Sequence, residues 1–454
     1  MKKIVFVFAL ISIVSTAFIF AEGKQESESE KTVITFWNSQ TTSHRVAAYD
    51  YVFQKFMNDH PDVIVKQELV NYGDMFNKTV VGMNTGTLPE FKQSDPTLSI
   101  FTWELGALAE VDDLIAKIDS SESYIPSVLI PTYHNGHHWS VPFSCAPNNL
   151  FYRPSMFEEA GVKVPKTWDE WLEAAEKLTI DKNSDGVIDQ YGIGLVASKT
   201  ACTDQYFAAF MAAAGGRYFD EKGNVVINSP EVIRALEMYK KLWKYTPPAA
   251  TGWQWGEIEN NWAAGTFAMT PYLNASFRQF YQAKNDDIAS TWTPWPADGK
   301  PGTTMCIQDF DIHKVAEERG TLEITKELIE FCMQPENIWV LTNGQEPGHF
   351  SPVTETAIDL VESGYVNEEI FLIKDFFGPK QKKIYEDHMK TIMSSVAHAT
   401  NYGFEMGPVN LAIGRISNEH VIQDMVQMVV IEGVPPAEAA VWAQEKAEKI
   451  SSEY

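Results

Sequence analysis

Short apolar runs alternate with helical patterns along most of the chain. Residues 32–37 and 63–69 are strand-like runs. Between them, apolar residues recur at helical spacing, which predicts a helix that ends at His60 before Pro61. This alternation of strands and helices continues through the chain and predicts an α/β architecture.

The segment 166–178 carries the strongest helix signal. Thr167 and Glu170 have the spacing of a capping box, in which each side chain satisfies a backbone N–H at the start of the helix. A second helix should begin with Ser229 as its cap and Pro230 as its first residue. Three further helices are predicted at residues 321–333, 418–431 and 435–450.

The first residues have the order of a secretory signal. Lys2 and Lys3 precede an apolar run at 4–20, and Ala21 is followed by a polar stretch. We therefore expect a signal peptide at 1–21 and a polar linker at 22–31. The alternative is an uncleaved anchor, because the apolar run is nearly long enough to span a bilayer. No cysteine precedes Cys145, so we expect a soluble periplasmic protein with no lipid attached through a thioether.

Composition excludes several classes of protein. The net charge of −25 over 454 residues disfavours nucleic acid, whose binding needs clustered cations. Hydrophobic residues make up 44% of the chain, which excludes wholesale disorder. Four widely spaced cysteines offer neither a metal-ligand spacing nor a dense disulfide framework, and leave open one or two disulfides or buried free thiols. They are Cys145, Cys202, Cys306 and Cys332.

Two groups of residues raise the question of a metal. Loop 181–192 offers calcium-ligand oxygens with a glycine at its sixth position, but Gly192 stands where a bidentate Glu belongs. Structural calcium and a plain turn both remain open there, and we expect no other cofactor. The candidate ligands are Asp181, Asn183, Asp185 and Asp189. The histidines at 134, 137 and 138 flank Asn135-Gly136, which predicts a hairpin turn and argues against zinc.

Residues 136–178 run GHHWSVPFSCAPNNLFYRPSMFEEAGVKVPKTWDEWLEAAEKL. This segment resembles the lobe-crossing region of the extracellular solute-binding proteins of ABC transporters, family 1, the maltodextrin-binding type. Weaker similarities at 86–91, 105–114, 215–236 and 262–269 follow in the family's order.

The resemblance implies the two-lobe periplasmic-binding-protein fold of type II, with a hinge and a ligand cleft between the lobes. It places the N-terminal lobe at 32–143 plus 303–345 and the C-terminal lobe at 144–302 plus 346–454. It also implies a monomer that works with an ABC permease.

A sugar site needs aromatic faces for the ring and planar polar groups for the hydroxyls. Polar loops at the carboxyl ends of strands are the expected place for it. In the first lobe the candidates are Asn38, Ser39, Gln40 and Asp95, with a plain turn and a helix cap as the alternatives. The crossing segments and the second lobe add Asn148, Asp204, Gln205, Tyr206, Trp253, Trp255, Tyr272, Asn274, Gln308, Asp309 and His349. Surface or core roles remain open for each.

Together these features predict a non-enzymatic receptor that captures a carbohydrate between its lobes and delivers it to an ABC permease. One alternative is a secreted carbohydrate-cleaving enzyme, which requires two carboxylates facing one bond. Acidic pairs such as Asp112-Asp113 are expected on solvated helix faces, so they are not candidates for the two catalytic carboxylates. Another alternative is the same fold with a non-sugar solute, such as a polyamine or a phosphorylated polyol.

Overall fold

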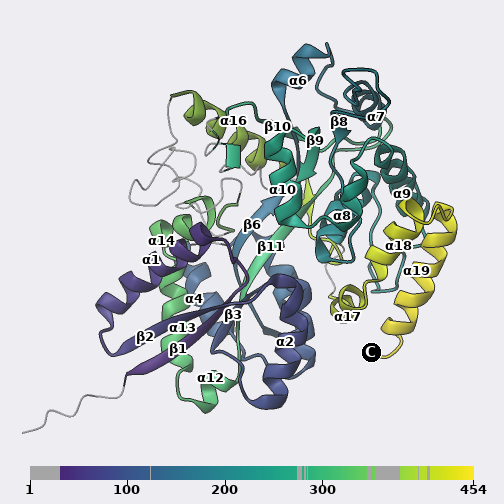
Figure 1. The fold of residues 1–454 in the computed structure, drawn as a ribbon. Coiled ribbons are helices and arrows are strands. Elements are labelled where there is room, and N and C mark those ends of the chain that lie inside the picture. Colours follow the sequence, from purple (N-terminus) through teal and green to yellow (C-terminus); the bar gives the residue numbers. More distant parts are fainter. Residues whose placement is uncertain are drawn as a thin grey trace, which may run out of the picture.

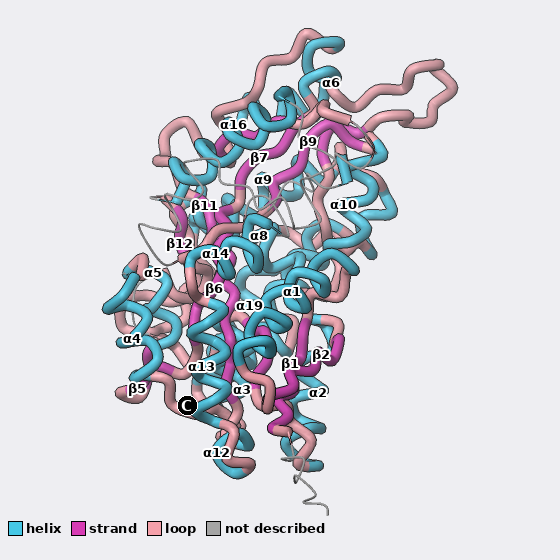
Figure 2. The backbone as a smooth tube through the Cα atoms, turned by 90° about the vertical axis from the view of Figure 1, so that its left-hand side faces the viewer, coloured by secondary structure: helices cyan, strands magenta, loops and turns pink. Residues whose placement is uncertain are grey.

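The computed structural model describes residues 31–122, 124–273, 279–280, 283, 285–344, 349–352, 379–396, 398–405 and 409–454. The chain forms two α/β lobes, which lie at the lower left and the upper right of Figure 1, and strands β6 and β11 run between them. The side view in Figure 2 shows the molecule elongated along the line that joins the lobes, with α12 at one end and α6 at the other.

The N-terminal lobe is built on a six-stranded sheet. Its strands are β1 (Thr32–Asn38), β2 (Val63–Leu69), β3 (Phe91–Ser94), β6 (Val141–Pro147), β11 (Thr303–Ile312) and β12 (Ala399–Thr400). Its helices are α1 (Ser43–Asp59), α2 (Tyr72–Thr85), α3 (Pro96–Glu104), α4 (Asp112–Glu122), α5 (Pro126–Leu129), η1 (Ile130–Thr132), α12 (Val315–Glu318), α13 (Leu322–Cys332), α14 (Pro335–Trp339) and η3 (Val340–Gly344). A separate hairpin joins β4 (Tyr133–His134) to β5 (His137–His138).

The C-terminal lobe is built on a four-stranded sheet in the order β10-β7-β9-β8. Its strands are β7 (Asn149–Tyr152), β8 (Tyr191–Ile193), β9 (Phe267–Tyr272) and β10 (Ala289–Trp292). Its helices are α6 (Pro154–Glu159), α7 (Trp168–Lys177), α8 (Ala201–Ala214), α9 (Pro230–Trp243), η2 (Pro248–Gly252), α10 (Trp255–Ala264), α17 (Ile413–Asn418), α18 (Val421–Val430) and α19 (Pro436–Ser451). Helix α16 (Pro379–Val396) contributes side chains to the cores of both lobes.

Strand direction determines which loops face the other lobe. Strands β2, β1 and β3 are parallel neighbours, so their carboxyl ends lie at one edge of the sheet. Strand β11 is antiparallel to β3 and to β6, and β6 leads directly into β7 of the other lobe. The polar residues that follow β1 and β3 therefore lie at the edge from which the chain crosses between the lobes.

The local predictions from hydrophobic spacing are confirmed. Strands β1 and β2 match the two predicted runs, and α1 ends at Asp59, with His60 as its C-cap. The capping box of Thr167 and Glu170 begins α7, and the side chain of Ser229 accepts from the backbone N–H of Val232 to cap α9. The three later helices appear as α13, α18 and α19. All four cysteines are free thiols, so the disulfide alternative is not realised.

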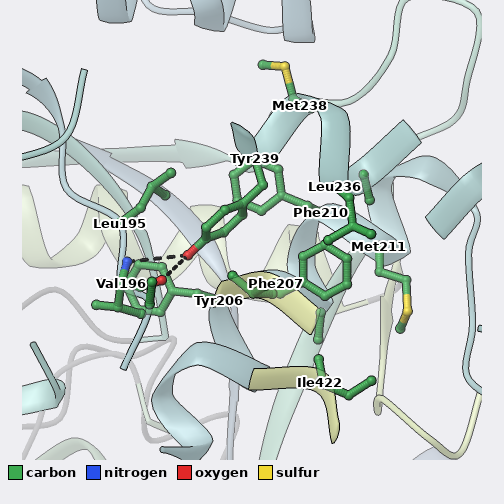
Figure 3. Packing of buried hydrophobic residues seen from close by; sticks show 14 of the residues in the cluster. Leu195, Val196, Tyr206, Phe207, Phe210, Met211, Leu236, Met238, Tyr239 and Ile422 are labelled. Atoms are coloured by element: carbon green, nitrogen blue, oxygen red, sulfur yellow. Dashed lines mark hydrogen bonds between the residues drawn. The ribbon is translucent and has the colours of Figure 1, made fainter. Parts of the chain in front are cut away.

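Each lobe has its own hydrophobic core. In the C-terminal lobe, Phe207 and Phe210 of α8 pack edge-on against Tyr239 of α9 (Figure 3). The hydroxyl of Tyr239 donates to the carbonyl of Val196 at 2.6 Å, so this buried polar group is satisfied. Several helical tryptophans lie in the cores; for example, the rings of Trp171 and Phe210 stack with their centres 4.9 Å apart. Among the described residues, no helix is both long and apolar enough to cross a membrane.

The lobes also touch beside the crossing strands, where α3 packs against α17. Gly414 of α17 allows this approach, because an added Cβ would lie 3.0 Å from the backbone nitrogen of Phe101. Farther out, the hydroxyl of Tyr454 donates to a carboxylate oxygen of Glu104 at 2.6 Å. The structure therefore holds the two lobes in direct contact.

Candidate ligand-binding site

The polar residues after β1 build a turn. Asn38 is fully buried, and its Oδ1 accepts from the backbone N–H of Gln40 at 2.7 Å, while its Nδ2 donates to Gln67 at 2.8 Å. Gln40 in turn accepts from Arg45, and Ser39 is half-buried between them. An Asn side chain commonly accepts a hydrogen bond from the backbone N–H two residues later in a turn. A role in the turn is therefore enough to explain the presence of Asn38.

Asp95 caps a helix and also reaches a tyrosine from a neighbouring helix. Its Oδ1 accepts from the backbone N–H groups of Thr97 at 2.9 Å and Leu98 at 3.2 Å, which satisfies open donors at the start of α3. Its Oδ2 accepts from the hydroxyl of Tyr72, the first residue of α2. The cap fixes the carboxylate at the sheet edge and thereby positions the tyrosine.

Five side chains meet where the lobes face each other, and we call them the interlobe cluster. The ring of Tyr72 meets the ring of Trp255 edge-on at 5.7 Å, across the gap between α2 and α10. The Trp255 Nε1 donates to Gln205 Oε1 at 2.9 Å, and the Gln205 amide contacts the sulfur of Cys306 at 3.7 Å. With Asp95 these residues form a continuous chain of contacts, which crosses between the lobes at the pair of rings and ends at Cys306 on β11.

The sequence placed three members of this cluster among its candidates, namely Asp95, Gln205 and Trp255. It missed Tyr72 and Cys306. A tyrosine at the start of a helix carries no local signal, and a thiol in a strand is ordinarily a core residue. Tyr402 is a further buried aromatic residue. Burial raises the pKa of its hydroxyl, and the charges of Asp95 and Cys306, two members of the cluster, raise it further, so this hydroxyl lies near the cluster. Its place follows from tertiary contacts alone.

Asp204 lies next to Gln205 on α8 and is 2% exposed. Its Oδ2 accepts from Gln423 at 2.9 Å and from the Ser417 hydroxyl at 3.4 Å. Its Oδ1 is buried and has no hydrogen-bond partner. Burial raises the pKa of Asp204 well above its ordinary value, and the charge of Asp95 in the other lobe raises it further.

Three aromatic candidates lie within the C-terminal lobe. Tyr206 is 1% exposed, and its hydroxyl shares a hydrogen bond with Thr270 at 3.1 Å. Tyr272 donates to a carboxylate oxygen of Glu259 at 2.7 Å. Trp253 does not lie exposed in its loop, because its ring packs in the core 6.1 Å from the ring of Phe267. The remaining candidate of this group, Asn274, lies outside the described residues.

The crossing strands hold the other candidates. The carbonyl of Asn148 accepts from the Thr303 hydroxyl at 2.7 Å, which ties the β6–β7 crossing to β11. Gln308 lies opposite Ser144 in the β6–β11 ladder, and Ser144 is 3.1 Å from the Nδ1 of His349. These residues form a second group, at the crossing strands.

Asp309 on β11 is fully buried, and the hydroxyl of Ser140 donates to it at 3.2 Å. Burial raises the pKa of its carboxyl, and the nearby charge of Asp311 raises it further. Ionising this carboxyl therefore costs more free energy than ionising an ordinary aspartate.

The predicted calcium loop forms a turn before β8, and its acidic side chains bond the loop's own backbone. Asp181 accepts from the N–H of Gly186 at 2.8 Å, and Asp189 accepts from the N–H of Lys182 at 2.7 Å. Among the described His, Cys, Asp and Glu residues, the acids of this loop are not gathered into a metal-ligand group.

We therefore expect calcium to bind this loop no more tightly than an ordinary acidic surface. Calorimetric titration of the chelator-treated protein with calcium should give no saturable heat, and its melting temperature should not change. The carboxylates lack the convergence that a calcium ion demands, and Gly192 supplies no bidentate oxygen. A saturable heat that disappears in Asp181→Asn would show that the calcium alternative is right.

The histidine hairpin forms as predicted, with Asn135 and Gly136 both at positive φ. His137 pairs with Asp112 at 2.9 Å, whereas His138 bonds the hydroxyl of Thr132 at 2.8 Å, so these histidines do not converge. A cavity of about 470 Å³ on the outer face of the N-terminal lobe lies between α1, α4 and α13, away from the interlobe cluster. Its charged rim consists of ion pairs such as Lys326 with Asp113.

Residues 39–337 match the model of the bacterial extracellular solute-binding protein family. Because this match spans more than half of the chain, the protein belongs to that family. It is an extracellular solute-binding protein of the ABC-transporter type.

Its relatives and structural neighbours agree with that class. YcjN, a periplasmic-binding protein assigned to an ABC transporter in Escherichia coli (strain K12), is 24% identical over 77% of this chain and 79% of its own length. A solute-binding protein of Thermotoga lettingae TMO bound with α-D-tagatose superposes with a TM-score of 0.75 at 23% identity, covering 93% of this chain and 100% of that chain. MalE3 of T. maritima bound to maltose gives a TM-score of 0.72 at 18% identity, with 92% and 99% covered. These structural similarities establish the two-lobe fold.

Proposed function

We propose that the protein captures a carbohydrate, a monosaccharide or an oligosaccharide, between its lobes and delivers it unaltered to an ABC permease. The interlobe cluster is the observation that carries this proposal. It places two aromatic rings, a carboxylate and an amide from opposite lobes within one chain of contacts. Rings of this kind can cover the C–H face of a sugar, and the planar polar groups can bond its hydroxyls.

The ligands of related proteins support a polyhydroxylated solute. A relative from Pseudomonas aeruginosa, 26% identical over 43% of this chain, is a mannitol-binding protein. A structural neighbour from Agrobacterium radiobacter K84 holds ribitol, at 20% identity and a TM-score of 0.71. Another neighbour holds glycerophosphocholine, so the fold also accommodates solutes that are not sugars. Among these solutes, a carbohydrate best matches the aromatic rings and the amide of the interlobe cluster.

Calorimetric titration against a panel of sugars and sugar alcohols tests the proposal. We expect at least one member to bind with a dissociation constant in the micromolar range, equivalent to about −8 kcal/mol. Trp255→Ala should weaken that binding about tenfold or more, because it removes the ring and the donor that holds Gln205. Trp442→Ala, on the outer helix α19, is the matched control and should bind as the wild type does. No heat with any member of the panel would overturn the carbohydrate assignment.

We also propose that the protein is exported, that it works with an ABC permease and that it is a monomer. The residues that carry the secretory signal lie outside the described residues, so cleavage near Ala21 stays a prediction. We expect a single chain to act alone, because one chain supplies both lobes and the cluster between them. Sedimentation of the mature protein with and without ligand would test the monomer.

The relatives are binding proteins, and we propose that this chain likewise performs no chemistry on its solute. A cleaving enzyme needs two carboxyl groups on either side of one glycosidic bond. In the interlobe cluster, both oxygens of Asp95 already accept hydrogen bonds. Incubation with oligosaccharides should therefore release no shorter product, and any release would favour the enzyme.

A further inference from the structure

The hairpin of β4 and β5 brings a histidine next to two acids at the start of α4. The Nδ1 of His137 lies 2.9 Å from a carboxylate oxygen of Asp112 and 3.5 Å from a carboxylate oxygen of Glu110. The three ligand atoms all lie within 4.8 Å of one another. We call these three side chains the hairpin triad. The three histidines of the hairpin do not converge on one another, but His137 converges with carboxylates from another segment.

Backbone hydrogen bonds hold the hairpin against the segment that carries the acids. The N–H of Val111 donates to the carbonyl of His138 at 3.0 Å, and the N–H of His138 donates to the other carboxylate oxygen of Asp112 at 3.0 Å. Strand β5 therefore lies beside α4, as the side view shows (Figure 2). Because the backbone sets this arrangement, the triad is held close to a ligand geometry before any ion arrives.

The triad carries more negative charge than its own residues neutralise. In the described structure, Glu110 and Asp112 both form their ion pairs with His137, and one imidazolium balances only one carboxylate. The three side chains are between 42% and 56% exposed, so an ion can reach them from solvent. A divalent cation beside a neutral imidazole would balance both carboxylates, and opposite charges attract strongly at such short range.

The donor set and its spacing indicate the kind of metal. Zinc takes imidazole nitrogen and carboxylate oxygen at about 2.0–2.2 Å, and many sites combine three protein ligands with one water in a tetrahedron. Bond lengths of this size place neighbouring ligand atoms about 3.4 Å apart. The distances from His137 Nδ1 to the two oxygens, 2.9 Å and 3.5 Å, lie on either side of that value. Calcium and magnesium prefer oxygen ligands alone, so the histidine favours zinc.

A second imidazole with unused nitrogens lies on the same face of the hairpin. His134 pairs directly with His137 across the turn, so both side chains leave the same face of the two strands. His134 is 8% exposed, and neither of its ring nitrogens has a hydrogen-bond partner in the described structure. Buried polar atoms are ordinarily satisfied. This face therefore carries a further nitrogen that could bond to a metal-bound water.

We propose that Glu110, Asp112 and His137 bind a zinc ion on the surface of the N-terminal lobe, with water in the open coordination position. Zinc takes the place of the proton between His137 and Asp112, and that proton is released to solvent. The bound ion ties the hairpin to the start of α4. The hairpin triad shares no residue with the interlobe cluster, so the inference is independent of the solute that the lobes capture.

Calorimetric titration of the chelator-treated mature protein with zinc chloride tests this inference. We expect one zinc ion to bind per chain with a dissociation constant in the micromolar range. The melting temperature should rise with zinc concentration, because the ion binds the folded protein and not the unfolded chain. Magnesium and calcium at the same concentrations should produce neither effect.

Two variants and one control assign the site. Glu110→Gln removes a carboxylate whose ion pair is with His137, and we expect it to weaken zinc binding tenfold or more. His137→Gln should abolish the one-to-one binding. His60→Gln is the matched control, because His60 pairs with Glu327 at 3.2 Å but belongs to no group of three ligands in the described structure. It should bind zinc as the wild type does.

Thermal unfolding without zinc checks that the variants fold, and Glu110→Gln decides the matter if His137→Gln does not. No saturable heat with zinc in the wild type would overturn the inference. Equal binding by the wild type, Glu110→Gln and His137→Gln would also overturn it and would indicate an adventitious ion only. An equal loss in His60→Gln would assign the zinc to scattered histidines, which contradicts a site at the hairpin triad.

Discussion

Replacing Gly192 by alanine is expected to destabilise the C-terminal lobe by about 3 kcal/mol or more. Gly192 lies in β8, where helix α7 passes directly over the strand. An added Cβ would lie 1.9 Å from the carbonyl oxygen of Ala175 and 2.6 Å from its carbonyl carbon. Both atoms belong to the backbone, so no side-chain rotation relieves the contact and the whole helix must move.

Urea unfolding would measure the effect, with Gly256→Ala as the matched control. Gly256 lies in α10, and an added Cβ there meets no atom within 4 Å. The control should keep the wild-type stability or gain up to about 1 kcal/mol from the higher helix propensity of alanine. Equal unfolding midpoints for Gly192→Ala and the wild type would contradict the close approach of α7 and β8.

Replacing Lys92 by methionine is the second change with a large expected effect. Lys92 and Asp311 are both fully buried, and the lysine lies 3.4 Å from the carboxylate. Removing one partner of a buried ion pair typically costs about 3–5 kcal/mol, because it leaves an uncompensated charge. Asp309 is a second buried carboxyl in this region, and the charge of Asp311 raises its pKa, so an Asp311 carboxylate without its lysine also acts on Asp309.

The loss should depend on pH, and its sign follows from the direction of the pKa shifts. Burial raises the pKa of Asp311 above its ordinary value of 3.8, and Lys92 opposes that rise. Without the lysine, the folded-state pKa rises further. A raised carboxyl pKa contributes stability that is present below 3.8 and lost as the pH rises through the folded-state value. Lys92→Met should therefore be least destabilised in acid and most destabilised at neutral pH.

Urea unfolding at pH 5 and at pH 8 would test this dependence. The double variant Lys92→Met/Asp311→Asn should recover much of the stability at pH 8, because it removes the orphaned charge and keeps an acceptor for the Ser99 hydroxyl. The same loss at both pH values, or no recovery in the double variant, would show that the charge of the pair is not the cause.

The sequence predicted those parts of the candidate site that depend on local chemistry. Asp95 before Pro96 was recognisable as a helix cap, and the cap is what holds its carboxylate at the sheet edge. Gln205 was found through the family resemblance, and Trp255 through its place among glycine and proline in loop-like sequence. Tyr72 could not be found in this way, because only the meeting of α2 with α10 gives its ring a partner.

In the loop before β8, by contrast, the sequence did not reveal why a key residue is present. Its spacing of Asp and Asn suggested calcium, and Gly192 stood out only as a missing glutamate. The structure gives Gly192 a different reason, which is the passage of α7 over the strand. This contact joins Gly192 to Ala175 of a different element, so it cannot be predicted from periodicity or composition.

By itself, the sequence determined the α/β alternation, the helix caps, the lobe-crossing segment and the family, because each of these follows from neighbouring residues or from their order. The tertiary structure decided which side chains meet between the lobes, why Trp253 is buried while Trp255 reaches Tyr72, and how Asp95 comes to influence Asp204. These outcomes depend on how two separately built lobes face each other, and long-range packing and burial determine that arrangement.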